Sequence, residues 1–96
     1  MPAYCLFDNV AVHDPAKLDI YKQRVAPLVE KYRGRYVVIG GDIEVIEGSW
    51  RPTFPVMIEF PTLDDAHRWY DSDEYRELKA LRQSAGEFNA VFFGGL

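Results

Sequence analysis

The sequence has few of the side chains that hold metals or form disulfides. It contains one cysteine, Cys5, and two histidines, His13 and His67. A single cysteine cannot form an internal disulfide, and Cys5 lies in an apolar run that is typical of a buried, unreactive thiol. Neither histidine has a second metal-binding side chain at the usual spacing. We therefore expect no metal centre, and a reducing, cytoplasmic location suits the chain.

Basic residues and long apolar runs are also scarce. Eleven Lys and Arg against fifteen Asp and Glu give a formal net charge of −4. No basic stripe is interleaved with aromatic residues, so nucleic acid is not an expected partner. No apolar run approaches the ~20 residues of a membrane span, and the N-terminus lacks the features of a signal peptide. No P-loop, dinucleotide fingerprint or nucleophile elbow occurs, which leaves those enzyme classes without support.

Apolar residues, in contrast, are abundant. Among 96 residues, 48% are hydrophobic and 15% aromatic, which is generous for the modest core of one small domain. The length predicts a single domain over residues 1–96. The surplus of apolar side chains predicts that a second apolar surface, outside this core, is also buried.

Local patterns predict alternating strands and helices. Asp14 and Thr62 are expected helix caps, Gly34 a helix end, and the stretch from Asp71 to Glu74 a break and restart of the second helix. The expected strands are Ala3 to Val12, Arg35 to Glu47 with an interruption at Gly40-Gly41, Thr53 to Phe60, and Phe88 to Phe93. The expected helices follow Asp14 and Thr62.

This order, β-α-β-β-α-β, predicts an α+β, ferredoxin-like domain. Such a domain has a four-stranded antiparallel sheet with both helices on one face. The strands are apolar at both parities: Val56, Ile58 and Phe60 alternate with Pro55 and Met57. Two helices cannot cover both faces, and a large exposed apolar face is a solubility hazard. We therefore predict a homodimer whose sheets pack face to face.

Several segments resemble one known family. They are EGSWRP, MIEFP and AHRWYDSDEYRELKALR, together with the Gly40-Gly41 pair. They resemble the domain-of-unknown-function family 1330, which belongs to the dimeric α/β-barrel superfamily. The resemblance implies a ferredoxin-like protomer whose dimer closes a barrel, and it implies no particular reaction.

The wider superfamily includes cofactor-free monooxygenases, haem-degrading enzymes and muconolactone-type isomerases. The resemblance implies a ligand between the sheet and the helices of one protomer. Haem-degrading relatives carry an iron-ligating histidine about three turns beyond the residue that matches Trp69, whereas Lys79, Ala80 and Leu81 occupy that region here. We therefore expect no haem and no other cofactor.

Glu59 is the first candidate for chemistry. It shares a strand face with Met57, opposite Ile58, so a dry dimer interface would raise its pKa and make it a general base. The structural alternative is an ion pair with Arg51 or Arg82. His67 is the second acid–base candidate, with a solvated surface histidine as the alternative.

Aromatic residues with neighbouring polar groups are the candidates for ligand binding. Trp50 could close a cavity mouth while Arg51, held extended by Pro52, binds a carboxylate; alternatively, Trp50 anchors the loop and Arg51 is solvated. The Trp69-x-x-Ser72-x-x-Tyr75 motif and Tyr70 either pack in the core or line a pocket for a flat apolar ligand.

The combined hypothesis is a homodimer that binds a small, partly apolar organic molecule. The binding residues would be Trp50, Arg51, Trp69, Tyr70, Ser72, Tyr75 and Arg82. The alternatives are a cofactor-independent isomerase or oxygenase that uses Glu59 or His67, and a purely structural dimer with a filled interior. A cavity distinguishes the last alternative from the other two.

Overall fold

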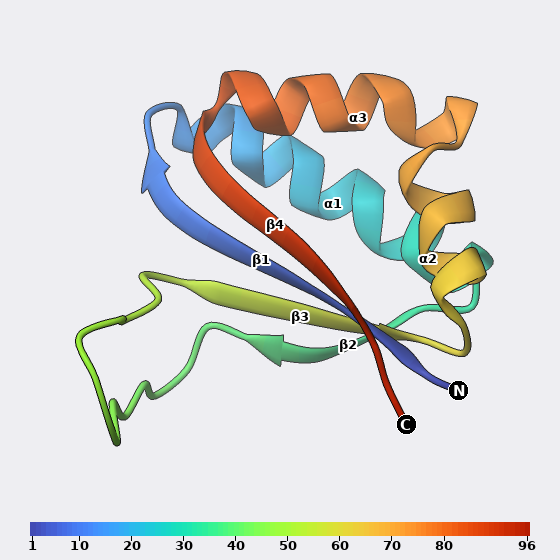
Figure 1. Cartoon of the computed structure of the whole chain (residues 1–96). Coiled ribbons are helices and arrows are strands. Elements are labelled where there is room, and N and C mark those ends of the chain that lie inside the picture. Colours follow the sequence, from blue (N-terminus) through green and yellow to red (C-terminus); the bar gives the residue numbers. More distant parts are fainter.

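The computed structural model describes all 96 residues, as four strands and three helices (Figure 1). In chain order the elements are β1 (Ala3–Val12), α1 (Pro15–Lys31), β2 (Arg35–Ile39), β3 (Pro55–Phe60), α2 (Leu63–Tyr70), α3 (Asp73–Ser84) and β4 (Gly86–Gly94). This is the predicted order, with the second helix divided into α2 and α3.

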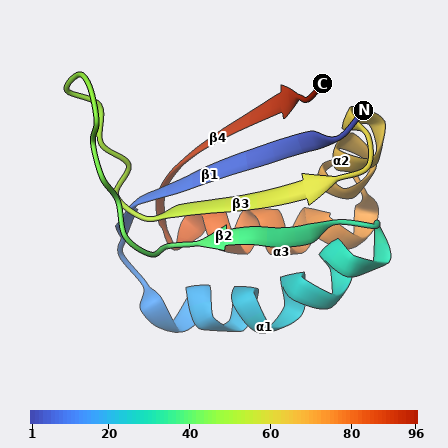
Figure 2. The ribbon, with the colours of Figure 1, turned by 90° about the horizontal axis from the view of Figure 1, so that it is seen from below.

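The strands form one antiparallel sheet in the order β2-β3-β1-β4. All three helices lie on the same side of the sheet, and the opposite face carries no helix (Figures 1 and 2). We call this second surface the open face. The molecule is a slab of 38 × 37 × 17 Å. The smallest of these dimensions corresponds to the thickness of one sheet and one helix layer. The predicted α+β, ferredoxin-like fold is confirmed.

Caps divide the second helical region as predicted. The Thr62 side chain accepts a hydrogen bond from the backbone N–H of Asp65 (3.1 Å) and begins α2. The Ser72 hydroxyl accepts one from the N–H of Tyr75 (3.1 Å) and begins α3. Each cap satisfies a backbone donor that has no partner inside its helix. The restart at Ser72 turns the chain, so that α2 and α3 pack against different parts of the sheet (Figure 1).

Several predicted boundaries were wrong. β3 begins at Pro55 and not at Thr53, and β4 covers Gly86–Gly94 and not Phe88 to Phe93. The second strand was expected to reach Glu47, but β2 ends at Ile39 because Gly40 and Gly41 both adopt positive φ angles, 61° and 94°, which a regular strand does not allow. Residues 40–54 form a long connection that projects beyond the end of the sheet (Figure 1). The helix end also differs: Arg33, with φ of 74°, takes the left-handed position expected of Gly34.

The core lies between the sheet and the helices. Cys5 and Phe7 of β1 and Ile58 and Phe60 of β3 face the helices and are buried. Trp69 from α2 fills the centre; its ring stacks on Phe60, with 5.6 Å between the ring centroids. Burial raises the pKa of the Cys5 thiol to about 12, so the expected buried, unreactive thiol is what the fold contains.

The open face is largely apolar. Strand pairing places Val38, Met57, Leu6 and Val91 in one cross-strand row. The adjacent row contains Arg35, Glu59, Tyr4 and Phe93. Val91 and Phe93 are about half exposed, because no element of the chain covers this side. Both faces of the sheet are therefore apolar, as the sequence pattern predicts.

Candidate functional site

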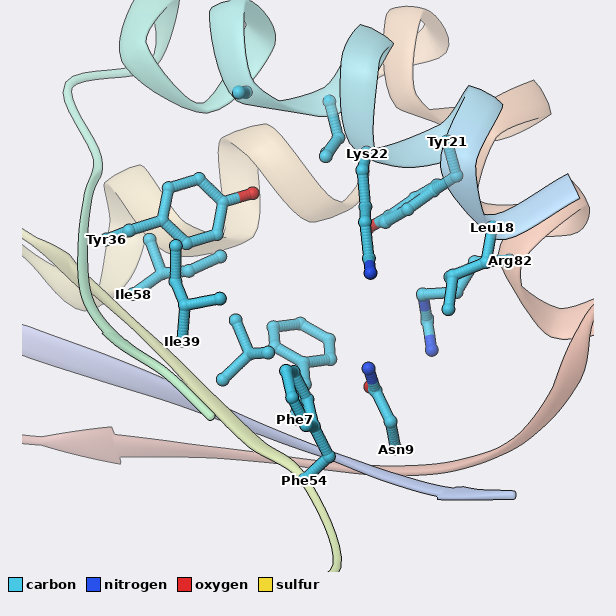
Figure 3. Close-up of a pocket in the computed structure, with 13 residues that line it drawn as sticks. Phe7, Asn9, Leu18, Tyr21, Lys22, Tyr36, Ile39, Phe54, Ile58 and Arg82 are labelled. Atoms are coloured by element: carbon cyan, nitrogen blue, oxygen red, sulfur yellow. The ribbon is translucent and has the colours of Figure 1, made fainter. Parts of the chain in front are cut away.

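A cavity of about 230 Å³ lies between α1 and the sheet (Figure 3). Ten of its thirteen lining residues are hydrophobic, so most of its wall is apolar. The lining residues are Phe7, Asn9, Leu18, Tyr21, Lys22, Val25, Ala26, Tyr36, Ile39, Phe54, Val56, Ile58 and Arg82. An engineered apolar cavity of about 150 Å³ binds benzene. The present cavity can therefore hold a molecule somewhat larger than one ring.

Five elements and the long connection contribute to this wall, with α3 supplying Arg82. The sheet floor comes from β1, β2 and β3, and α1 covers it. Phe54, at the end of the connection, closes one side. The exposed lining residues form the rim, and they are Lys22, Ala26, Ile39 and Phe54. A ligand would therefore enter between the connection and α1.

Every polar side chain of the cavity wall can donate a hydrogen bond, and two of them are cationic. Arg82, Lys22 and Asn9 are its non-hydrophobic residues, and Tyr21 and Tyr36 add hydroxyl groups. Figure 3 shows the nitrogen-bearing ends of Arg82, Lys22 and Asn9 in the same part of the cavity. No carboxylate and no histidine lines the wall. The local charge is positive although the whole chain is acidic.

The cavity phenols are neutral at physiological pH. The Tyr21 hydroxyl lies 2.7 Å from that of Tyr75, and burial raises the pKa of both. Burial also raises the pKa of Tyr36 to about 12. These hydroxyls can donate or accept hydrogen bonds, but they supply neither a negative charge nor a base near neutral pH.

Arg82 is the only predicted binding residue that lines the cavity. It projects from α3 and is 5% exposed. None of the six salt bridges of the chain involves it, and its Nε atom is buried without a hydrogen-bond partner. Its guanidinium carbon lies 5.3 Å from the ring centroids of both Phe7 and Phe88. The side chain is therefore held by aromatic rings and not by a carboxylate.

The Trp69 motif lies in the core, beside the cavity and not in its wall. Trp69 and Tyr75 are fully buried, with 4.4 Å between their ring centroids. Tyr70 packs edge-to-face on Trp69, and Ser72 caps α3. Of the two interpretations of these residues, core packing is the one that matches their positions. Tyr75 alone approaches the cavity, through its hydroxyl contact with Tyr21.

The Trp50-Arg51 pair lies on the long connection, away from the cavity lining. Trp50 is 69% exposed, and Arg51 is exposed and makes no salt bridge. The connection is instead held by Asp8, whose carboxylate accepts hydrogen bonds from the backbone N–H groups of Thr53 (2.9 Å) and Phe54 (2.8 Å). This contact keeps Phe54 in the cavity wall and leaves Trp50 in solvent.

Glu59 lies on the open face, as its parity predicts, but its environment differs from the expected one. The partner is Arg35, with 2.9 Å from Nε to Oε1, and neither Arg51 nor Arg82. Hydrogen bonds from Arg35 and then Tyr4 lower the pKa of Glu59 below its ordinary range. The raised pKa expected for a general base is therefore not a property of the protomer.

His67 is exposed on α2. Its ring centroid lies 5.5 Å from that of Phe92, and its Nδ1 lies 3.9 Å from a carboxylate oxygen of Asp71. It does not line the cavity. No group of three or more His, Cys, Asp or Glu side chains converges in the fold, and no helix is long and apolar enough to cross a bilayer.

The cavity residues missed from the sequence left weak signals. Asn9 follows Cys5 and Phe7 at the same parity of β1, so a polar side chain faces the helices among apolar ones. The apolar spacing of α1 predicts that Tyr21 faces the core, but no neighbouring residue indicates that its hydroxyl lines a cavity. Lys22 and Tyr36 gave no signal, because only the packing of α1 over β2 brings them together.

Comparison with known proteins confirms the family resemblance. A profile of the domain of unknown function DUF1330 matches residues 2–96. The chain belongs to this family. Membership in DUF1330 assigns no reaction, since the family is described by its unknown function. No functionally curated protein matches this DUF1330 chain.

Solved structures similar to this DUF1330 protein include uncharacterised and enzymatic proteins. RPA0582, a protein of unknown function from Rhodopseudomonas palustris, is 18% identical with a TM-score of 0.76, over 99% of this chain and 82% of that one. SnoaB, a cofactor-independent oxygenase from Streptomyces nogalater, is 12% identical with a TM-score of 0.58, over 99% and 91%.

A third similar structure is an ethyl tert-butyl ether d (ethd) family protein from Bacillus halodurans. It is 13% identical with a TM-score of 0.62, over the whole of both chains. At these identities the three structures share only the fold with the present DUF1330 protein, and their activities cannot be transferred by fold alone.

Proposed function

We propose that this DUF1330 protein is a homodimer that binds a small, mostly apolar organic molecule in the cavity between α1 and the sheet. The observation that carries the proposal is the cavity itself, which is open at one rim and combines apolar walls with a few convergent polar groups. This combination is typical of small-molecule sites. A purely structural dimer would have a filled interior, and neither Trp50 nor Tyr75 fills this space.

The open face supports the homodimer. Its apolar rows include Leu6, Met57 and Val91, and no element of the chain covers them. Burial of apolar area is the principal driving force of association, and a second copy of the same sheet presents a surface of matching shape. The cavity lies on the other side of the sheet, so dimerisation in this manner leaves its rim accessible. A cytoplasmic location, expected from the single cysteine, belongs to the same proposal.

The catalytic roles of Glu59 and His67 stay predictions. Neither residue lines the cavity, and the lowered pKa of Glu59 makes it a weaker base. Glu59 could act on a ligand only at the open face, in a second site that the dimer would have to form. Binding without turnover is therefore the function that the geometry supports best.

Binding can be tested by filling the cavity from its rim. Ala26 lines the cavity and is exposed, so Ala26→Trp can place an indole there without disturbing buried residues. Ala80→Trp is the matched control, because Ala80 is exposed on α3 and lies outside the cavity lining. The neutral probe 2-naphthamide, titrated by protein-observed NMR, should shift resonances of cavity residues in the wild-type protein.

Ala26→Trp should weaken this binding about tenfold or more, as expected for overpacking of a filled site. Ala80→Trp should leave the affinity unchanged. Absence of binding at millimolar probe, or equal binding by the Ala26→Trp variant, would overturn the cavity as the ligand site.

A further inference from the structure

Arg82 carries the strongest sign of what the cavity binds. We infer that the ligand carries an anionic oxygen, such as a carboxylate or an enolate, and that the Arg82 guanidinium binds it. This inference rests on the proposed cavity and adds the chemical class of its ligand. The recognised molecule is a flat apolar body of about one or two rings with one acidic group.

Arg82 differs from the other buried charged residues in lacking a partner for its charge. Three charged residues are buried: Asp8, Asp65 and Arg82. The Asp8 carboxylate accepts hydrogen bonds from backbone N–H groups. The Asp65 carboxylate lies 2.9 Å from the guanidinium of Arg68. Arg82 has neither a salt bridge nor a partner for its Nε, although removing an unpaired charge from water is expensive.

Groups of the protein around Arg82 compensate its charge only in part. Phe7 and Phe88 attract the guanidinium through their ring faces, which explains how the side chain is held. Aromatic rings accept hydrogen bonds from N–H groups only weakly, compared with an oxygen atom. The Tyr75 hydroxyl is the one oxygen that meets Arg82: the Arg82 charge and a hydrogen bond between the two side chains oppose the increase in the Tyr75 pKa, but burial still dominates and keeps this phenol neutral.

Nearby carboxylates do not fill this role either. Glu87 lies with Arg82 along a shallow hollow on the outer side of α3 and β4, yet the two form no salt bridge. The Arg82 side chain also borders the cavity, whose wall contains no acidic residue. A ligand oxygen there would supply the missing negative charge.

The arrangement of donors defines the ligand further. Lys22 from α1 and Asn9 from β1 bring their nitrogen atoms to the part of the cavity where Arg82 projects (Figure 3). Ile39, Ile58 and the Tyr36 ring form an apolar wall away from these donors (Figure 3). A planar guanidinium binds a carboxylate through two parallel hydrogen bonds. A molecule with an acidic oxygen at one end and a ring at the other therefore matches both regions.

A pair of probes with the same shape tests this inference. 2-Naphthoate and 2-naphthamide differ in charge but not in ring size. Their affinities should be measured by calorimetry or NMR for the wild-type protein, Arg82→Met, and Arg76→Met. Methionine keeps an unbranched apolar stem, and Arg76 is an exposed arginine on the same helix.

The wild-type protein should bind naphthoate about 10- to 100-fold more tightly than naphthamide, the range expected for hydrogen bonds to a charged group. Arg82→Met should abolish this preference and leave naphthamide binding nearly unchanged, and Arg76→Met should retain it. Circular dichroism checks that each variant is folded; the comparison of probes on the wild-type protein decides the question even if Arg82→Met does not fold.

The other outcomes separate the two proposals. Equal affinities of the wild-type protein for both probes would overturn the anionic ligand and leave the cavity proposal intact. A preference that persists in Arg82→Met would overturn the assignment to Arg82. Binding of neither probe would overturn the cavity proposal, and this inference with it.

Discussion

The Nε atom of Arg35 donates a hydrogen bond to Oε1 of Glu59 over 2.9 Å, on the sheet face that carries no helix. The two residues are direct partners in the register of β2 and β3. This relationship makes Glu59 part of an ion pair on the open face, where it lies on the opposite side of the sheet from the cavity. The charged pair interrupts an otherwise apolar surface and would be enclosed when two sheets meet.

The pairing predicts a pH dependence of stability. Because Arg35 and Tyr4 hold the pKa of Glu59 below its ordinary range, the folded state favours the carboxylate. The stabilisation is present above the ordinary glutamate pKa and is lost as pH falls through the lowered folded value. Glu59→Gln should remove this part of the pH dependence, measured as the urea midpoint against pH.

Glu74→Gln is the matched control for that experiment. Hydrogen bonds from Lys31 and Tyr32 also lower the pKa of Glu74, which lies on the helix layer. Both variants should flatten the acidic limb of the stability curve, whereas only Glu59→Gln should also alter self-association. A Glu59 resonance that titrates above the ordinary value of about 4.3 would contradict the prediction, and it would favour a desolvated carboxylate at a sheet interface.

The open face predicts a second result, on assembly. A lysine at Val91 would place a charge at the β4 end of the apolar row formed with Leu6 and Met57. Val91→Lys should raise the dimer dissociation constant about tenfold or more, since an unpaired charge would be buried at the interface. Sedimentation velocity over a range of concentrations measures this change.

Ile20→Lys is the control for the assembly experiment. Ile20 is also about half exposed, but it lies on α1, away from the open face. It should leave the sedimentation profile unchanged. A wild-type protein that sediments as one chain at all concentrations would overturn the proposed homodimer. A Val91→Lys variant that dimerises normally would overturn the open face as its interface.

The contact between the Tyr21 and Tyr75 hydroxyls predicts non-additive stability. These groups link α1 to α3 over 2.7 Å and are partly buried. Tyr21→Phe leaves the Tyr75 hydroxyl without its partner, which should cost about 1–3 kcal/mol in the free energy of unfolding. The double variant with Tyr75→Phe should lose less than the sum of the two single losses, because both polar groups are then removed.

Urea denaturation of the four proteins gives this coupling energy. Additive losses would show that each hydroxyl is satisfied elsewhere, for example by solvent that enters the cavity. Because Tyr21 also lines the cavity, the Tyr21→Phe variant further tests whether its hydroxyl contributes to binding of 2-naphthamide.

Much of the fold follows from local chemistry. Thr62 and Ser72 cap their helices independently of the tertiary fold, because a cap satisfies backbone groups within three residues of itself. The alternation in β3 likewise separates Ile58 from Glu59 in any sheet. The element order, the helix break and the apolar character of both sheet faces could therefore be predicted from the sequence.

The site could be predicted only in part, because its contacts join residues far apart in the chain. Arg82 was predicted as a polar group of the site, but its separation from Glu59, which lies on the other side of the sheet, was not. Trp50 was expected either to close a cavity mouth or to anchor its loop; the glycine pair instead begins a long connection in which Trp50 is exposed to solvent.

The amino-acid order alone determined which elements form and which side chains share a face, since both depend on neighbours within a few positions. The tertiary structure decided which faces meet: it paired Glu59 with Arg35, buried Trp69 in the core and directed Arg82 to a cavity with no acidic residue in its wall. The physical reason is that strand register and helix packing are collective results of burying the whole core, and no local spacing encodes them.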